Sequence, residues 1–229
     1  MIQNIIDNLK NQGIEIDLAQ SNLIQEMIEA IPPDKSFISK FKKSKLDKTS
    51  FYIWGEVGRG KTLITKSFIN QLNKNKAIFH YIDFIQNIHN ELANLSGKSD
   101  PLNFIAKSLS KKYQIIFIDE FQIEDVADAM IIGNLLNQLI QLDVILYITS
   151  NAHPNDLYKD GLQRQKFIDA MKILQKKLNV HKLDGIIDYR TRNIVNLNQG
   201  NPNQIFDDKD ILLFIKANFE NKNFAQKTF

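Results

Sequence analysis

One short segment, Gly55-Glu-Val-Gly-Arg-Gly-Lys-Thr62, constrains the fold of this chain more than any other part of it. It matches the pattern G-x-x-x-x-G-K-[ST], in which glycines allow successive backbone N–H groups to close around phosphate oxygens. The dipole of a following helix also favours an anion at its N-terminus. The segment therefore predicts a strand, a phosphate-binding loop and a helix in immediate succession.

Two side chains of this loop have specific expected roles. Lys61 would pair with the β and γ phosphates of ATP, and the Thr62 hydroxyl would bind Mg²⁺. Arg59 would either contact phosphate or stay solvated, and the sequence leaves both interpretations open. The residues expected to hold ATP are Gly55, Glu56, Val57, Gly58, Arg59, Gly60, Lys61 and Thr62.

A pair of carboxylates follows a second apolar run. The run 115–118 (Ile-Ile-Phe-Ile) predicts a buried strand that ends at Asp119 and Glu120. The carboxyl ends of strands are where ligands bind in open α/β sheets. We expect Asp119 to hold the Mg²⁺ shell, mainly through water. Glu120 would polarise the water that attacks the γ-phosphate, and such general-base help is typically worth about 10²–10⁴ in rate.

A third candidate follows the apolar run 144–148, which is succeeded by Thr149, Ser150 and Asn151. A polar side chain at the end of a strand beside the carboxylate strand can reach the γ-phosphate or the attacking water. Asn151 fits that catalytic position. The alternative is an Asx-type turn before Pro154.

Short apolar runs alternate with longer amphipathic segments along the chain, which is typical of a parallel α/β sheet covered by helices on both faces. The first 30 residues predict helix, which ends at Pro32-Pro33. The expected strands are 51–54, 77–79, 115–118 and 144–148. The expected helices that follow are 61–72, 84–95, 101–112 and 125–142.

The pattern divides the chain into three parts. Residues 1–48 form a helical N-terminal segment and a lysine-rich linker, and 49–197 form the nucleotide-binding core, with a last strand over Asn193–Leu197. Residues 198–229 form a polar tail with one helix, Asp210–Phe219.

Composition excludes several classes of site. The 229 residues include no cysteine, which excludes disulfide scaffolds, thiolate zinc sites and cysteine nucleophiles. The net charge of +3 is too small to require nucleic acid or a membrane as partner. No signal peptide or transmembrane segment is expected, which favours the cytoplasm. The four histidines lack a metal-ligand pattern, so packing or surface roles are expected for them.

Taken together, these motifs resemble an AAA+ ATPase of the P-loop NTPase fold, with Asp119-Glu120 as its Walker B pair and Asn151 as sensor 1. Further segments resemble the ZapE family of cell-division ATPases over roughly residues 9–190. The segments that carry this resemblance are GEVGRGKT, DEFQIEDVADAM (119–130), Thr149–Asn151, LYKDGLQR (157–164), LDGIIDYR (183–190), GIEIDLAQ (13–20) and the spacing of His80, Phe84 and His89.

The resemblance implies an ATP- and Mg²⁺-dependent enzyme that acts on a protein client, FtsZ, at the division ring. It also implies a homo-oligomer in which Arg164 completes the site of the neighbouring subunit, an effect worth about 10³–10⁵ in other NTPases. The alternative for Arg164 is a surface helix charge. Nucleic acid is not the expected partner, and peripheral membrane association stays open.

The C-terminal region departs from the family pattern. Family members continue into a helical lid that carries a further nucleotide-facing arginine, whereas no arginine follows Arg192 and residues 198–229 do not resemble that lid. Two alternatives to the division ATPase therefore stay open. One is a helicase-loader-like protein acting on nucleic acid, and the other is a nucleotide-binding switch with little turnover.

Overall fold

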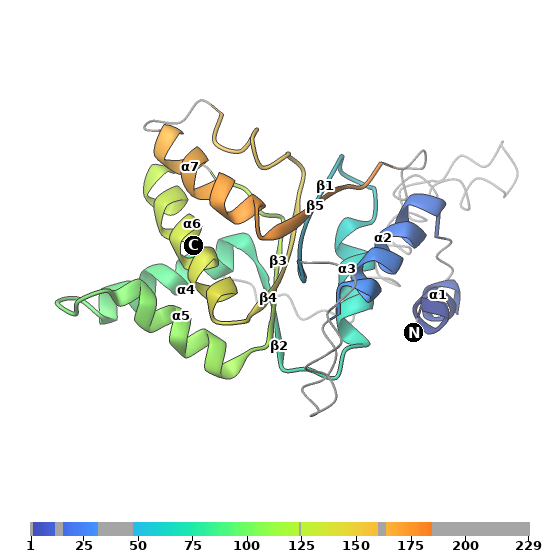
Figure 1. Ribbon diagram of the computed structural model, residues 1–229, viewed down its shortest axis with the longest axis horizontal. Helices are drawn as coiled ribbons and strands as arrows, with labels where there is room; N and C mark the ends of the chain where they lie inside the picture. The colour runs from blue at the N-terminus through green and yellow to red at the C-terminus, as the bar shows by residue number, and fades with distance from the viewer. Residues whose placement is uncertain (1, 12–15, 32–47, 124, 160–163, 185–229) are drawn as a thin grey trace, which may run out of the picture. The chain divides into compact units, whose positions relative to one another are not determined.

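Alternating strands and helices build one parallel sheet with helices on both faces (Figure 1). The computed structural model describes residues 2–11, 16–31, 48–123, 125–159 and 164–184. None of the helices in these ranges is both long and apolar enough to cross a membrane. The strands are β1 (Ser50–Trp54), β2 (Lys76–His80), β3 (Ile115–Asp119), β4 (Ile145–Ser150) and β5 (Leu178–Lys182). The helices are α1 (Ile2–Asn11), α2 (Leu18–Glu29), α3 (Lys61–Asn70), α4 (Tyr81–Asn94), α5 (Pro101–Lys112), α6 (Val126–Gln141) and α7 (Arg164–Gln175).

The five strands lie in the order β2-β3-β4-β1-β5, and every pair is parallel. Parallel strands all end at the same edge of the sheet, and this edge is where open α/β proteins bind ligands. The order places the end of β4 between the end of β3 and the end of β1. The predicted parallel α/β sheet is confirmed.

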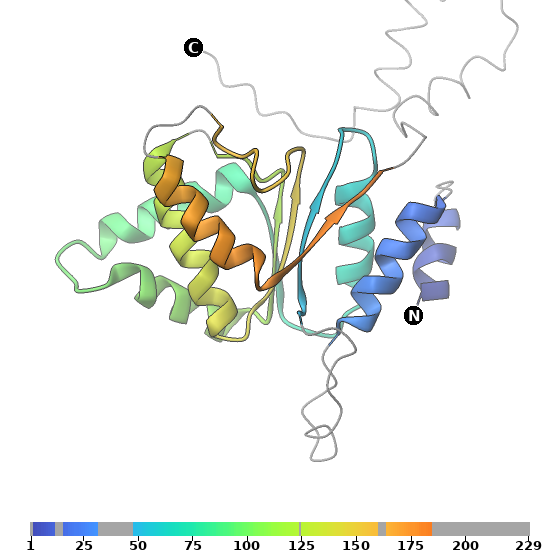
Figure 2. The same cartoon turned by 45° about the horizontal axis from the view of Figure 1, so that its top comes forward.

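Two hydrophobic clusters cover the two faces of the sheet, because successive side chains of a strand point to opposite faces. Phe51, Ile53 and Phe117 pack with α1, α2 and α3 on one face. Tyr52 and Ile116 pack with α4, α5, α6 and α7 on the other. Figures 1 and 2 show these two helical layers on either side of the strands.

The N-terminal helices share the core of the sheet. Leu23, Ile24 and Met27 of α2 are fully buried in the cluster that contains strands β1, β3 and β4. Helix α2 begins with a capping box, in which the Asp17 side chain accepts from the Gln20 backbone N–H and Gln20 reciprocates. The division into 1–48, 49–197 and 198–229 stays a prediction, since residues 32–47 and 185–229 lie outside the described ranges.

Most predicted elements are confirmed, with small shifts at their ends. Strand β4 continues through Thr149 and Ser150, because these residues pair with Ile53 and Trp54 of β1. Helix α4 begins at Tyr81, directly after β2. The predicted stop at Pro32-Pro33, the lysine-rich linker, the strand 193–197, the helix 210–219 and the motif residues 185–190 lie outside the described residues.

Helix α7 and strand β5 are absent from the sequence-based prediction. Among the described strands β5 lies at the edge of the sheet and pairs with β1, and its sequence LNVHK alternates instead of forming an apolar run. Helix α7 buries Phe167, Met171 and Leu174 at helical spacing between charged neighbours. Both elements carry weaker hydrophobic signals than the elements buried on two sides.

The end of helix α3 is closed by a lysine from the next strand. The ammonium of Lys76 donates to three backbone oxygens, those of Ile69 at 3.0 Å, Asn70 at 3.3 Å and Leu72 at 2.9 Å. Carbonyl groups at a helix C-terminus lack partners within the helix, and the helix dipole favours a cation there. Lys76 thus stabilises α3 at the end opposite the phosphate loop.

The shared core gives a stability prediction. Leu23→Ala should lower the free energy of unfolding by about 2–5 kcal/mol, because it removes a fully buried side chain and leaves a cavity. Leu18→Ala is the matched control on the same helix, since Leu18 is 78% exposed, and it should change stability by less than about 0.5 kcal/mol. Urea denaturation measures both. Equal effects would show that α2 does not belong to the core.

Candidate nucleotide-binding site

Because successive side chains of a strand point to opposite faces of the sheet, Asp119 and Thr149 lie on the same face, at the edge where the strands end. In β3, Asp119 shares the face of Phe117, which packs toward α3. In β4, Thr149 shares the face of Tyr147 in the same way. The carboxylate and the hydroxyl therefore meet at the start of α3.

Asp119 is buried, and hydroxyl groups from two other elements satisfy its carboxylate. Its Oδ1 accepts from Thr62 Oγ1 of α3 at 2.7 Å and from Thr149 Oγ1 of β4 at 2.5 Å. The Nζ of Lys66 lies 3.7 Å from Oδ2. A buried carboxylate is costly unless it is paired in this way. These contacts fix β3, β4 and α3 relative to one another at the site.

The loop before α3 has the backbone geometry that its glycines permit. Gly60 has φ +78°, a left-handed conformation that favours glycine, and is the residue before the first helical position. At Gly55 a Cβ would lie 2.5 Å from the Leu183 carbonyl oxygen. The N-cap residue Gly60 has no side chain that could cap α3, and the first N–H groups of a helix lack partners within the helix and favour an anion.

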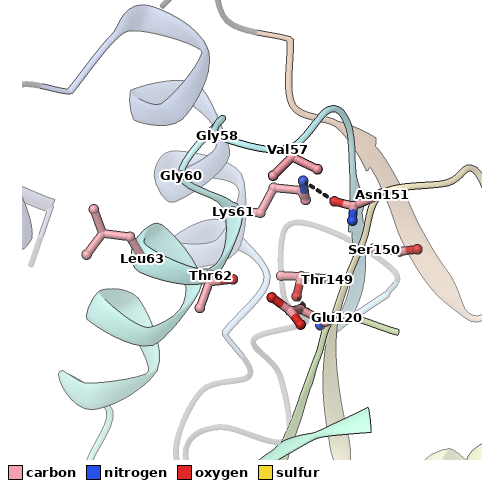
Figure 3. Close-up of a pocket in the computed structure, with 10 residues that line it drawn as sticks. All are labelled: Val57, Gly58, Gly60, Lys61, Thr62, Leu63, Glu120, Thr149, Ser150 and Asn151. Atoms are coloured by element: carbon pink, nitrogen blue, oxygen red, sulfur yellow. Dashed lines mark hydrogen bonds between the residues drawn. The ribbon is translucent and has the colours of Figure 1, made fainter. Parts of the chain in front are cut away.

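The Lys61 side chain folds back over this loop. Its Nζ donates to the Gly55 and Glu56 carbonyl oxygens, each at 2.7 Å, and to Asn151 Oδ1 at 3.0 Å (Figure 3). Burial lowers the pKa of the Lys61 ammonium, and the carboxylates of Asp119 and Glu120 oppose that shift. Three oxygen acceptors thus hold a buried cation at the centre of the site.

A cavity of about 200 Å³ opens between the loop and the strand ends (Figure 3). Most of the predicted site residues line it, and the lining comes from the loop, α3, the end of β4 and the residues that follow β3 and β4. The lining residues are Val57, Gly58, Gly60, Lys61, Thr62, Leu63, Glu120, Thr149, Ser150 and Asn151.

Glu120 adopts an unusual backbone conformation beside this cavity. Its φ is +56°, in the left-handed region that non-glycine residues rarely occupy. Hydrogen bonds to β4 hold it there: the Glu120 N–H donates to Thr149 Oγ1 at 3.2 Å, and the Phe121 N–H donates to the Thr149 carbonyl at 2.7 Å. The carboxylate is 71% exposed and lies 4.0 Å from His80 Nδ1. The chain is strained at the residue expected to act as general base.

Five predicted residues are not among those that line the cavity, namely Gly55, Glu56, Arg59, Asp119 and Arg164. The Gly55 and Glu56 carbonyl oxygens accept from Lys61. Asp119 lies behind Thr62, to which it is hydrogen-bonded. The Arg59 Nη2 pairs with Glu56 Oε2 at 2.6 Å, and its role toward phosphate stays a prediction. Arg164 begins α7, and its Nη2 donates to the Asn155 carbonyl oxygen at 2.7 Å.

Sequence reasoning missed the roles of three residues around the site. The sequence places Thr149 after an apolar run and in a segment that resembles the ZapE family, without a role of its own, yet its hydroxyl links Asp119 to Glu120. Gln20 donates to the Arg59 carbonyl oxygen at 3.0 Å. Lys66 lies one helical turn after Thr62, a spacing that could have placed it beside Asp119.

The histidines make contacts of the kind expected for packing and surface residues. His89 Nε2 lies 2.6 Å from Asp128 Oδ1, and His181 Nδ1 lies 3.0 Å from Glu26 Oε2. His153 packs edge-on against Trp54. Within the described ranges, no group of three or more His, Cys, Asp or Glu side chains could hold a metal ion.

The donor set at the start of α3 nevertheless fits Mg²⁺. The hydroxyl oxygen of Thr62 and the carboxylate of Asp119 are adjacent hard oxygen ligands. Mg²⁺ is usually bound by one or two protein oxygens together with waters and substrate phosphates. Such a site needs no larger cluster of acidic residues.

The sequence matches a known protein family over most of its length. The family model described as AFG1-like ATPase matches residues 4–206. The chain belongs to the AFG1-like ATPase family. This membership confirms the resemblance to the ZapE family. The description of the family names it for an ATPase activity.

Two relatives illustrate the extent of the similarity. The cell division protein ZapE of Escherichia coli strain K12 is 33% identical over 184 residues, which cover 75% of this chain and 49% of that protein. Lactation elevated protein 1 homolog B of Danio rerio is 32% identical over 205 residues, which cover 81% of this chain and 40% of that protein. The chain thus spans about half the length of these relatives or less.

Solved structures show the same fold at low sequence identity. Domain III of the Thermotoga maritima replication initiation protein DnaA has a TM-score of 0.53 at 18% identity, with 90% of this chain and 79% of that chain covered. AMPPCP-bound DnaA from Aquifex aeolicus has a TM-score of 0.52 at 15% identity, with 90% and 59% covered. The AFG1-like chain therefore has the P-loop AAA+ fold.

The contacts of Lys61 give a binding prediction. Lys61→Ala should weaken ATP affinity by about a hundredfold or more, since hydrogen bonds to a charged group are worth about 1.5–3 kcal/mol each. Calorimetric titration with ATP and Mg²⁺ measures this. Lys107→Ala on the exposed side of α5 removes the same charge elsewhere and should leave affinity unchanged. Equal affinity for the Lys61 variant and the parent protein would contradict the assignment.

Proposed function

We propose that this chain binds ATP with Mg²⁺ and hydrolyses it to ADP and phosphate in the cytoplasm. The observation that carries this proposal is the convergence of Lys61, Glu120 and Asn151 on one cavity, with Asp119 hydrogen-bonded behind it. Membership in an ATPase family supports the same chemistry. Turnover itself is the part of the proposal that needs measurement.

Each residue would contribute a distinct part of the reaction. The N–H groups of the loop and of the start of α3 would bind the β and γ phosphates. The ammonium of Lys61 would donate to a phosphate oxygen in place of one of its present protein acceptors. Glu120 would accept the proton of the attacking water, and Asn151 would orient that water or the γ-phosphate. Thr62 and Asp119 would hold Mg²⁺, which when bound neutralises phosphate charge.

Arg164 would act on the site of a neighbouring copy. Its guanidinium is tied to the Asn155 carbonyl, and Arg164 is not among the residues that line the cavity of its own chain. Its buried Nε has no hydrogen-bond partner among the described residues. A guanidinium directed at the phosphates of the next subunit would offset the charge that develops during transfer.

The client would be a protein of the division ring. The E. coli relative is named a cell division protein, and the family resemblance implies FtsZ as the client. The chain spans about half the length of this relative. Binding of FtsZ and assembly into an oligomer are therefore proposed here and not taken over from the relative. Similarity to DnaA at under 20% identity supports the fold and not the binding of nucleic acid.

The role of Glu120 gives the central test. Glu120→Gln should keep ATP binding and lower the turnover rate by about 10²–10⁴, since the amide cannot accept the proton. Steady-state phosphate release and calorimetry measure the two quantities. Glu91→Gln on the exposed side of α4 is the matched control. Equal turnover of the Glu120 variant and the parent would reject the base assignment.

The same assay tests the client. Stimulation of turnover by FtsZ supports the division proposal, whereas stimulation by single-stranded DNA, lost at higher salt, supports the loader alternative. Tight binding with no turnover under any of these conditions supports the nucleotide switch.

The role of Arg164 predicts a dependence on assembly. Specific activity should rise with protein concentration, and inactive Arg164→Ala subunits mixed with the parent should lower its activity more than dilution does. Lys172→Ala, which removes an exposed charge from the same helix, should not have this effect. Specific activity that is constant from nanomolar concentrations upward, with no inhibition in mixtures, would exclude action across subunits.

A further inference from the structure

The side chain of Gln20 lies buried between helix α2 and the phosphate loop. It is 2% exposed, and its Nε2 donates to the Arg59 carbonyl oxygen at 3.0 Å. The two residues are 39 positions apart in the sequence. A buried amide that reaches the backbone of the loop is unusual for a helix whose other buried residues are mostly apolar.

The orientation of this side chain is fixed at both ends. The backbone N–H of Gln20 donates to Asp17 Oδ1 at 2.8 Å, and the side-chain Oε1 accepts from the Asp17 backbone N–H at 3.2 Å. With its oxygen committed to the cap of α2, the carboxamide directs its nitrogen at the loop. Helix α2 is in turn held by its buried apolar side chains in the core beneath the sheet.

The shape of the loop matches this contact at Gly60. A Cβ on Gly60 would lie 2.8 Å from Gln20 Nε2, and its φ of +78° already favours glycine. The peptide plane that carries the Arg59 carbonyl also carries the Gly60 N–H, because the peptide bond is planar and trans. A donor that fixes the carbonyl on the α2 side therefore directs the N–H away from α2. Gly60 lines the cavity.

We propose that Gln20 is a positioning residue, which holds the Arg59–Gly60 peptide of the phosphate loop in its phosphate-receiving orientation. This inference rests on the proposed nucleotide binding and adds a role for the N-terminal helix in it. The loop then needs less rearrangement when phosphate binds, which raises affinity by preorganisation. By linkage, bound nucleotide stabilises the first turns of α2 to the same extent.

Two substitutions separate positioning from mere support of α2. Gln20→Glu keeps an oxygen for the Asp17 N–H and replaces the donor to Arg59 with an acceptor. Gln20→Met keeps the length and burial of the side chain and removes both hydrogen bonds. Gln25→Met is the matched control, since Gln25 lies on the exposed side of α2.

Calorimetric titration with ADP is the first measurement. Both Gln20 variants should bind ADP about fivefold to tenfold more weakly than the parent, the effect of losing one hydrogen bond of typical strength, and Gln25→Met should bind as the parent does. A purely structural role would lower the thermal midpoint of the nucleotide-free protein and leave ADP affinity unchanged, and that result would overturn the inference. Loss of ADP binding by the parent itself would instead overturn the proposed function together with it.

Hydrogen exchange on the parent protein is the second measurement, and it does not require the variants to fold. Saturating ADP should slow exchange of the backbone N–H groups of residues 18–24 at least severalfold. The control segment is α5, whose exchange should not change. Unchanged exchange in α2, with ADP bound, would overturn the inference.

Discussion

The carboxylate of Asp119 is buried, and hydroxyl groups from a helix and a neighbouring strand donate to it beside the Lys66 ammonium, which offsets the cost of burying its charge. The bond from Thr62 ties the end of β3 to the start of α3, and the bond from Thr149 ties β3 to β4. The Thr149 hydroxyl also accepts from the Glu120 N–H, and Lys61 of α3 donates to Asn151 after β4. A parallel sheet makes the arrangement possible, since its strands end at one edge and alternate residues face the same helix.

The phosphate loop is held from two directions. On one side the ammonium of Lys61 binds the backbone of the loop and reaches Asn151 at the end of β4. On the other side Gln20 binds the Arg59 carbonyl from α2. Helix α2 and strands β1 and β3 belong to one hydrophobic cluster, so the contact from α2 has a rigid base. Gln20, in the N-terminal segment 1–48 that the sequence separates from the core, therefore contacts the phosphate loop directly.

Local patterns predict the parts of this structure that depend on neighbours in the sequence. Strands β1 and β3 are buried on both faces and form continuous apolar runs, and the loop motif specifies its own backbone. The contacts of Thr149 with Asp119 and of Gln20 with Arg59 join residues 30 and 39 positions apart. The hydrophobic pattern of the sequence does not predict such pairs, because these contacts form only when the helices and strands pack together. Strand β5 was missed because only Leu178 of its five residues is buried, so its sequence contains no apolar run.

Helix α3 has ten residues and is about 15 Å long, with the phosphate-loop motif at one end and the Lys76 amine at the other. Acetylation of that single amine would remove its charge and leave carbonyl oxygens of the last turn to water. The change would fall well outside the pocket, yet it would loosen the element that carries Lys61 and Thr62. Modification of Lys76 would thus affect the phosphate loop indirectly, through the stability of helix α3.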